Sequence, residues 1–208
     1  ETDGYEADDI LGTLAVQANK LGVEANLITS DLDMLQLIDE NTKVFAMKRG
    51  FSDIEEFDLE YFENKYGLKQ SQFLDLKALQ GDSSDNIPGV PGIGEKTAVK
   101  LLNEYGSLEG IYAHIEEISG AVQKKLMAGR GSAEMSLKLA RIMTDAPVKL
   151  SDVPALKLDF SRISEVFKRL EFNNLLKKLK IDAHKVGITY TATPPEAVGL
   201  FLSKDYHA

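Results

Sequence analysis

Hydrophobic residues near the start of the chain recur every three or four positions, the spacing of an amphipathic helix. Over residues 6–21 these are Ala7, Ile10, Leu11, Leu14, Ala15, Ala18 and Leu21. The apolar segments at 24–30 and 42–48 are instead short and nearly continuous, as in buried strands. A helix followed directly by such a strand is typical of an α/β fold with a parallel sheet.

Further along the chain, the pattern becomes almost wholly helical. A helix is predicted at 58–66, with Asp58 as its N-cap and Gly67 just past its end. Other helices are predicted at 71–80, 95–105, 107–118, 121–128, 132–143, 161–170 and 172–179. A strand pattern at 186–193 is broken by the proline pair that follows it.

This pattern predicts three regions. Residues 1–80 form the C-terminal part of an α/β core, and residues 81–181 form a helical subdomain. Residues 182–208 are a linker or the start of another domain. Two strands before residue 50 are too few for a stable sheet, and the sequence starts without Met at an acidic motif. We therefore interpret the chain as an N-terminally truncated fragment.

Composition and charge narrow the class of protein. The 208 residues are 43% hydrophobic and 27% charged, with no apolar run long enough for a transmembrane span. Cysteine is absent, which excludes disulfides and thiolate metal sites and favours a cytoplasmic protein. The net charge of −9 is unevenly distributed, because residues 1–40 carry ten acidic residues and one lysine, whereas residues 121–208 carry fifteen basic and nine acidic residues. Local patches decide contacts with phosphate, so nucleic acid is not excluded.

Seven acidic residues occur in three short motifs, each in a different local setting. The motifs are GYEADD with Glu6, Asp8 and Asp9, LITSDLD with Asp31 and Asp33, and GDSSDN with Asp82 and Asp85. The first opens a predicted helix, the second ends a predicted strand, and the third leads into a turn rich in glycine and proline. Taken singly, each acid could simply cap or solvate its own element.

Convergence of these carboxylates would require a counter-ion. Two carboxylates about 5 Å apart repel by roughly 3 kcal/mol at an effective dielectric of about 20. A few such pairs rival the whole stability of a domain, about 5–15 kcal/mol. A site rich in carboxylates and free of cysteine selects Mg²⁺ or Mn²⁺, and two such ions can promote phosphodiester hydrolysis. We therefore predict that the seven acids are catalytic metal ligands.

The segment GVPGIGEKTA at 89–98 nearly matches a phosphate-binding P-loop. Glu95 separates Gly94 from Lys96, however, and no strand is predicted before the segment. A Gly-x-Gly sequence that opens a helix fits a helix–hairpin–helix-type turn better, because Gly92 and Gly94 let the backbone approach a DNA phosphate. The alternative is a tight connection between helices that needs glycine only for its geometry.

These motifs resemble those of the 5′-nuclease domain of bacterial DNA polymerases of type I, within the flap-endonuclease superfamily. The similarity covers about residues 3–180, from GYEADDILGTLA through ITSDLDMLQL, FENKYGL, LKALQGDSSDNIPGVPGIGEKTAVKLL and LARIMTDAPV to FKRLEFNNLL. The resemblance implies a parallel-sheet, PIN-like nuclease core, incomplete at its N-terminus, and an all-helical DNA-binding subdomain. It also implies two-metal hydrolysis of DNA at 5′ ends and 5′ flaps in replication and repair.

The resemblance assigns roles to individual residues. Glu6, Asp8 and Asp9 would serve one metal site, and Asp31, Asp33 and Asp82 the other, with Asp85 close by or acting through water. The DNA backbone would be held by Gly92, Ile93, Gly94, Lys96 and Thr97. The carbonyl oxygens of this turn would in addition coordinate K⁺. The expected partner is nicked or 5′-flap duplex DNA. The expected protein is a cytoplasmic monomer without membrane contact, covalently linked to polymerase domains.

Two departures from the family pattern and two alternative functions remain. The family usually carries a basic residue where this chain has Leu32. Its first metal-binding aspartates and its helical arch would lie upstream of residue 1, so we expect this fragment by itself to be a weak or inactive nuclease.

One alternative is a non-catalytic DNA-binding module. The other is an Asp-dependent phosphatase, although Met34 and Leu35 stand where its small hydroxyl residue is expected.

Overall fold

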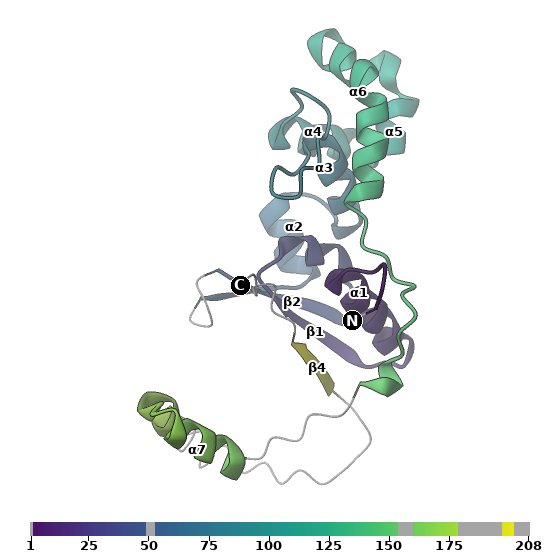
Figure 1. Ribbon diagram of the computed structural model, residues 1–208. Coiled ribbons are helices and arrows are strands. Elements are labelled where there is room, and N and C mark those ends of the chain that lie inside the picture. Colours follow the sequence, from purple (N-terminus) through teal and green to yellow (C-terminus); the bar gives the residue numbers. More distant parts are fainter. Residues whose placement is uncertain (1, 49–52, 154–159, 179–196, 202–208) are drawn as a thin grey trace.

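A four-stranded mixed sheet forms one end of the molecule (Figure 1). The computed structural model describes residues 2–48, 53–153, 160–178 and 197–201. The strands are β1 (Glu24–Thr29), β2 (Thr42–Met47), β3 (Ile54–Phe57) and β4 (Ala197–Phe201), in the spatial order β3-β2-β1-β4. β1 pairs in parallel with β2 and β4, and β2 pairs antiparallel with β3. The two aspartates of the LITSDLD motif, Asp31 and Asp33, follow directly after the C-terminal end of β1.

The sequence predicted two of these strands, and both are confirmed as β1 and β2. β3 was not predicted, because Glu55 and Glu56 interrupt its apolar pattern and its exposed positions suit an edge strand. β4 lies within residues 182–208, for which we predicted a linker or the start of another domain. The predicted strand at 186–193 lies outside the described residues.

The helices near the sheet begin and end where local capping residues allow. α1 (Ala7–Lys20) packs on β1, and the 3₁₀ helix η1 (Leu32–Leu37) follows β1 directly. α2 (Leu59–Tyr66) confirms the predicted caps, because Asp58 accepts a hydrogen bond from the Tyr61 amide and Gly67 adopts the left-handed conformation. The predicted helix at 71–80 is the short η2 (Gln70–Gln72) followed by α3 (Phe73–Gln80).

The helical part of the chain lies above the sheet in Figure 1. It contains α4 (Glu95–Tyr105), α5 (Leu108–Ala113), η3 (Ile115–Glu117) and α6 (Gly120–Leu139). We predicted two helices at 121–128 and 132–143, but α6 is one continuous helix. A helical glycine costs only about 0.5–1 kcal/mol relative to alanine, so Gly129 and Gly131 do not break a helix that packs against α3.

One continuous hydrophobic core joins the sheet to the helical part. It includes Leu27 and Phe57 on the strands, Leu79 on α3, and Leu102 and Leu126 on α4 and α6. Interiors are packed as densely as organic crystals, so displacement of one element is resisted by its neighbours. The acidic motif at 82–85 lies between α3 and α4 and is therefore anchored on both sides by this core.

The chain after α6 returns to the sheet and runs along α1. Asp9, Thr13 and Gln17 share one face of α1, at spacings of four residues. Their side chains accept hydrogen bonds from the backbone amides of residues 143, 146 and 150, at 2.7, 3.0 and 2.8 Å. The segment contains η4 (Leu150–Asp152). This row of bonds attaches the end of the helical part to the α/β part.

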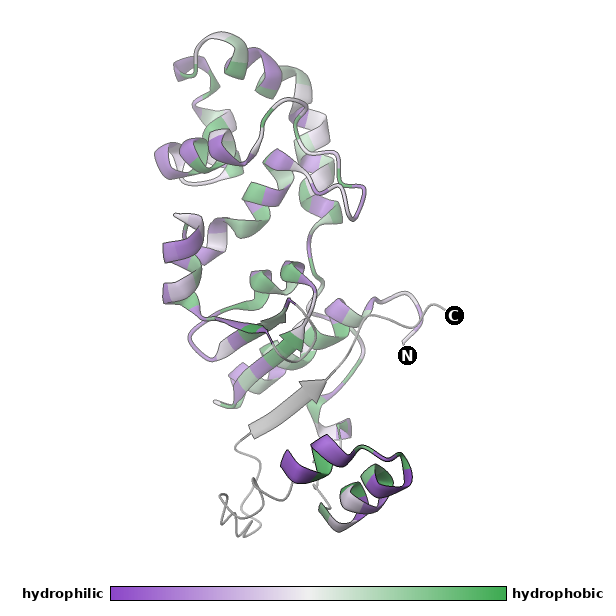
Figure 2. Cartoon of the chain, turned by 90° about the vertical axis from the view of Figure 1, so that its left-hand side faces the viewer, coloured by the Kyte–Doolittle hydropathy of each residue, from purple (hydrophilic) through white to green (hydrophobic). Residues whose placement is uncertain are grey.

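α7 (Phe160–Arg169) stands apart from the sheet in both views, and Figure 2 shows hydrophilic and hydrophobic residues alternating along it. None of its residues is buried. Residues 173–178 are also helical, in line with the predicted helix at 172–179. No helix within the described parts of the chain has the length and apolar character to span a membrane.

The two glycines inside α6 give a paired test of this packing. A Cβ at Gly129 would lie 2.8 Å from Cγ1 of the buried Val90, whereas a Cβ at Gly131 would meet nothing within 4 Å. Gly131→Ala should raise the free energy of unfolding by about 0.5–1 kcal/mol through helix propensity. Gly129→Ala should lower it relative to Gly131→Ala by about 1–3 kcal/mol through overpacking. Urea unfolding measures both, and equal stabilisation by the two variants would contradict the packing of α6 on Val90.

Candidate metal centre and nucleic-acid interface

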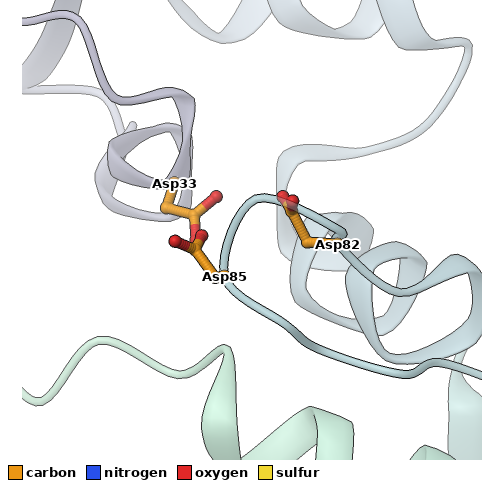
Figure 3. Close-up of side chains that lie close together, drawn as sticks. All are labelled: Asp33, Asp82 and Asp85. Atoms are coloured by element: carbon orange, nitrogen blue, oxygen red, sulfur yellow. The ribbon is translucent and has the colours of Figure 1, made fainter.

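Three of the seven predicted acids come together between η1 and the loop after α3. Asp33, Asp82 and Asp85 each offer a carboxylate oxygen, and these oxygens lie within 4.8 Å of one another. Figure 3 shows Asp33 reaching from η1 toward the loop that carries Asp82 and Asp85. Asp33 and Asp82 are half-buried and Asp85 is exposed. Within the described residues, this is the group of carboxylates close enough to share one metal ion.

Local hydrogen bonds hold Asp33 in place. The Thr29 hydroxyl at the end of β1 accepts from the Asp31 amide at 3.0 Å. Asp31 is the N-cap of η1, and its Oδ1 accepts from the Asp33 amide at 2.9 Å. Asp31 therefore caps η1. The sequence alone did not separate this structural role from metal binding.

The loop that carries Asp82 and Asp85 is closed at its base. The Asp82 amide donates to the Ile87 carbonyl at 2.9 Å, and the Ile87 amide donates to the Asp82 carbonyl at 2.7 Å. The Ser84 amide donates to Asp82 Oδ1 at 2.9 Å, and Asn86 takes a positive φ of 57° that completes the turn. We call residues 82–87 the acid loop. These bonds close the loop and orient the Asp82 carboxylate.

Lys77 of α3 is the functional residue that sequence analysis missed. Its side chain is buried, and its ammonium donates to the carboxylates of both Asp33 and Asp82. A lysine in a helical pattern is usually solvated, and buried lysines are rare unless they are paired. Its spacing of five residues before Asp82 gave no sign that the tertiary structure would bury it. Lys77 thus joins η1 to the acid loop.

The pKa shifts follow from burial and from this bridge. Burial raises the pKa of Asp33, an effect that outweighs the hydrogen bond from Lys77. Burial would also raise the pKa of Asp82, but hydrogen bonds from Lys77 and Ser84 outweigh it and lower that pKa to about 2. Burial would lower the pKa of Lys77, but its two carboxylate partners outweigh burial and raise the pKa. The ammonium is therefore charged, and it balances part of the negative charge of the cluster.

The first acidic motif is not part of this cluster. Glu6 is exposed at the N-cap of α1, and its amide donates to Asp9 Oδ2 at 3.0 Å. Asp9 Oδ1 accepts from the Met143 amide at 2.7 Å. Both carboxylate oxygens of Asp9 thus bind backbone amides, so this residue caps α1 and attaches the chain that returns from α6. Asp8 is half-buried in the first turn of α1.

The predicted phosphate-binding turn lies between the acid loop and α4. Gly92 has a φ of +80°, and Gly94 is the N-cap of α4 in an extended conformation. Ile93 is buried, and its amide donates to the Val90 carbonyl at 2.9 Å. Lys96 is exposed in the first turn of α4, and the Thr97 amide donates to the Gly94 carbonyl at 3.0 Å. A buried Ile93 anchors the turn and leaves the exposed Gly92 and Gly94 on the surface.

Two protein-family models together match most of the chain. The model for the 5′-3′ exonuclease N-terminal resolvase-like domain matches residues 1–67, and the model for the 5′-3′ exonuclease C-terminal SAM fold matches residues 68–183. DNA polymerase I of Bacillus subtilis is 45% identical over 186 residues, which are 88% of this chain and 21% of that protein. DNA polymerase I of Bacillus caldotenax is 47% identical over 183 residues, or 86% of this chain and 21% of that protein. The chain thus spans about a fifth of the length of these relatives.

Solved structures show the same fold. A 5′-exonuclease mutant of bacteriophage T5 superposes with a TM-score of 0.58 at 27% identity, over 68% of this chain and 57% of that one. The T5 flap endonuclease in a pseudo-enzyme–product complex with DNA and metal ions gives 0.59 at 27% identity, over 68% and 51%. The catalytic core of Rad2 in complex with DNA gives 0.54 at 18% identity, over 81% and 61%, which is a likeness of fold alone.

Removal of the Lys77 ammonium should expose the repulsion within the cluster. Lys77→Met keeps most of the side-chain volume but leaves Asp33 and Asp82 without their cation, and should lower the free energy of unfolding by about 3 kcal/mol. Millimolar Mg²⁺ should stabilise Lys77→Met more than it stabilises the parent chain, because no ammonium competes for the carboxylates. Urea unfolding with and without Mg²⁺ measures both effects.

Lys43→Met is the matched control, since Lys43 forms an exposed ion pair with Glu56 that should contribute less than about 1 kcal/mol. If Lys77→Met were as stable as Lys43→Met, and were stabilised by Mg²⁺ to the same extent, the charge balance assigned to Lys77 would be wrong.

Proposed function

The chain belongs to the 5′–3′ exonuclease family, and from this premise we propose that it hydrolyses DNA phosphodiesters at 5′ ends and 5′ flaps. The observation that carries the proposal is the approach of Asp33, Asp82 and Asp85 to within 4.8 Å of one another, with Asp82 and Asp85 in a loop that continues directly into the glycine-rich turn. Carboxylates suited to a metal and a backbone suited to phosphate are thus a few residues apart. A nuclease needs both on one surface.

The donor set of the cluster fits a divalent metal ion. Three carboxylates without histidine or cysteine suit Mg²⁺ or Mn²⁺, and the negative charge that Lys77 leaves unbalanced favours a cation. Asp33, Asp82 and Asp85 would hold one ion. Asp31 is proposed for this same ion, and Glu6, Asp8 and Asp9 are proposed for the second ion, as their family motifs imply. When bound, such ions supply activation of a water and stabilisation of the leaving oxygen.

The chain's own residues prepare the site. The Asp31 cap and the closed acid loop direct Asp33, Asp82 and Asp85 toward one point, so their orientation costs little when a cation arrives. The protonated Lys77 holds Asp33 and Asp82 together. Asp85 is the most exposed of the three carboxylates.

The proposed DNA-binding residues are Gly92, Ile93, Gly94, Lys96 and Thr97 of the turn. Exposed glycines allow close approach of a phosphate, and the first amides of α4 lie at the positive end of its helix dipole. We propose that carbonyl oxygens of the turn also coordinate K⁺. The Gly92 carbonyl already accepts from the Lys125 ammonium at 2.9 Å, so K⁺ would use the second lone pair or other carbonyls.

The biological setting is proposed from the relatives. The named relatives are DNA polymerases I, of which this chain matches about a fifth. We propose that it acts as a monomer in the cytoplasm, joined covalently to polymerase domains, on nicked or 5′-flap duplex DNA in replication and repair. A DNA complex of the T5 flap endonuclease, which shares this fold, supports DNA as the partner.

Cleavage should depend on the exposed carboxylate of the cluster. Asp85→Asn keeps the shape of the residue and leaves both Lys77 ion pairs intact. It should slow single-turnover cleavage of a 5′-flap duplex by at least about 100-fold, since even outer-shell changes at metal sites cost about 10–100-fold. Affinity for the same DNA should stay within about threefold. Glu109→Gln, an exposed acid on α5, is the control and should match the parent.

Cleavage by the parent chain without divalent metal, or parent-like cleavage by Asp85→Asn, would contradict the proposal. DNA binding without any cleavage, both by the parent chain and by a version extended at its N-terminus, would support the alternative of a non-catalytic DNA-binding module.

DNA affinity should depend on the turn and not on base sequence, because backbone amides and lysines contact phosphate. A Cβ at Gly94 meets nothing within 4 Å and its backbone is extended, so Gly94→Val should fold normally but hold the DNA backbone away. Lys96→Ala should lower the slope of log affinity against log salt by about one unit. Fluorescence anisotropy across a salt series measures both. Lys20→Ala, at the far end of α1, is the control. If Gly94→Val bound DNA as tightly as the parent chain, the turn would be only a structural connection between helices.

A further inference from the structure

One face of α6 holds the short segment that joins the acid loop to the phosphate-binding turn. Lys125, Gly129, Ser132 and Ser136 are spaced by four, three and four residues, so they form a single stripe along the helix. Each of them contacts residues 89–92. We call this stripe the α6 clasp.

The two serines bind both backbone polar groups of Gly89. The Ser136 hydroxyl accepts from the Gly89 amide at 3.0 Å, and the Ser132 hydroxyl donates to the Gly89 carbonyl at 2.6 Å. Ser136 is fully buried and Ser132 is half-buried. A buried amide without a partner is costly, so these hydroxyls specify where Gly89 lies.

Gly89 also fixes the base of the acid loop. It has a φ of +61°, and a Cβ there would lie 2.3 Å from the backbone nitrogen of Gly81. The backbones of Gly81 and Gly89 therefore touch on either side of residues 82–87. The next amide, of Val90, donates to the Leu79 carbonyl at 2.8 Å. Displacement of Gly89 would therefore move the closed end of the loop that carries Asp82 and Asp85.

The other end of the stripe holds the phosphate-binding turn. The side chain of Val90 packs on Gly129, where a Cβ would come within 2.8 Å of it. The Lys125 ammonium donates to the Gly92 carbonyl at 2.9 Å, and its methylene carbons cover the space where a Gly92 side chain would lie. The same helix face thus contacts the segment at both of its ends, over four consecutive residues.

We propose that Ser132 and Ser136 are positioning residues for the metal centre. Through Gly89 they hold the acid loop against η1, so that Asp82 and Asp85 face Asp33, and they keep the loop at a fixed separation from the turn. This inference rests on the proposed function, because it assigns to the α6 clasp the task of aligning metal-bound and DNA-bound groups. Neither serine touches metal or DNA, so each acts through the backbone of Gly89.

The test measures local order and metal affinity without any cleavage assay. In Ser132→Ala/Ser136→Ala, the amides of Asp82, Ile87 and Gly89 should exchange with deuterium at least about tenfold faster than in the parent, whereas the amides of α4 keep their parental rates. Mn²⁺ affinity, measured by electron paramagnetic resonance on the folded protein, should fall about tenfold, as for outer-shell changes at other metal sites. Affinity for a 5′-flap duplex without divalent metal should change little, because Lys125 still holds Gly92.

Two further variants separate positioning from a general loss of stability. Ser132→Thr keeps the hydroxyl and should keep the parental Mn²⁺ affinity, whereas Ser132→Ala alone should lower it even if variants at the buried Ser136 fail to fold. Ser119→Ala removes an exposed serine at the N-cap of the same helix and should leave every readout unchanged.

The outcomes distinguish this inference from the proposed function. Parental exchange rates at the acid loop, or parental Mn²⁺ affinity, in the double variant would overturn the role of the α6 clasp. A parent chain that binds Mn²⁺ but no DNA would overturn the proposed function, while the fall in Mn²⁺ affinity would still support the clasp. A parent chain that binds no Mn²⁺ would overturn both.

Discussion

The buried ammonium of Lys77 is the interaction on which the site depends. It lies between Asp33, which follows β1, and Asp82, which follows α3, and so joins the α/β part to the acid loop. Three carboxylates and one ammonium leave a formal charge of −2. Two carboxylates about 5 Å apart repel by roughly 3 kcal/mol at an effective dielectric of about 20. Lys77 therefore reduces the repulsion between the carboxylates in the folded chain. The remaining charge of −2 is one that a single divalent cation would balance.

The architecture holds the acid loop and the glycine-rich turn in fixed positions relative to η1. A continuous core extends from the sheet through α3 to α4 and α6, so the acid loop and the phosphate-binding turn cannot shift independently of η1. The α6 clasp adds direct hydrogen bonds to the segment that joins the acid loop to the glycine-rich turn. The returning chain is attached to α1 through Asp9, Thr13 and Gln17. The carboxylate cluster and the glycine-rich turn are therefore held by one connected set of elements.

Much of this arrangement could be predicted from the sequence, and the failures have physical reasons. The ends of α2 were predictable because Asp58 and Gly67 act within one turn of the helix. β3 was missed because edge strands tolerate charged residues, and α6 was divided because glycine was given more weight than tertiary packing. The role of Lys77 was invisible, since burial of a lysine depends on distant segments. The structural contribution of Asp9 was equally invisible, since one of the two backbone amides that donate to its carboxylate comes from Met143, far along the chain.

The most direct test of the account is the position of a bound metal ion. Anomalous diffraction from crystals grown with Mn²⁺ would locate the ion, because manganese scatters anomalously and magnesium does not. The account predicts an anomalous peak in contact with Asp33, Asp82 and Asp85, with the Lys77 ammonium withdrawn from at least one of its two carboxylates. Mn²⁺ bound elsewhere, with both Lys77 ion pairs unchanged and no peak between the three aspartates, would contradict it.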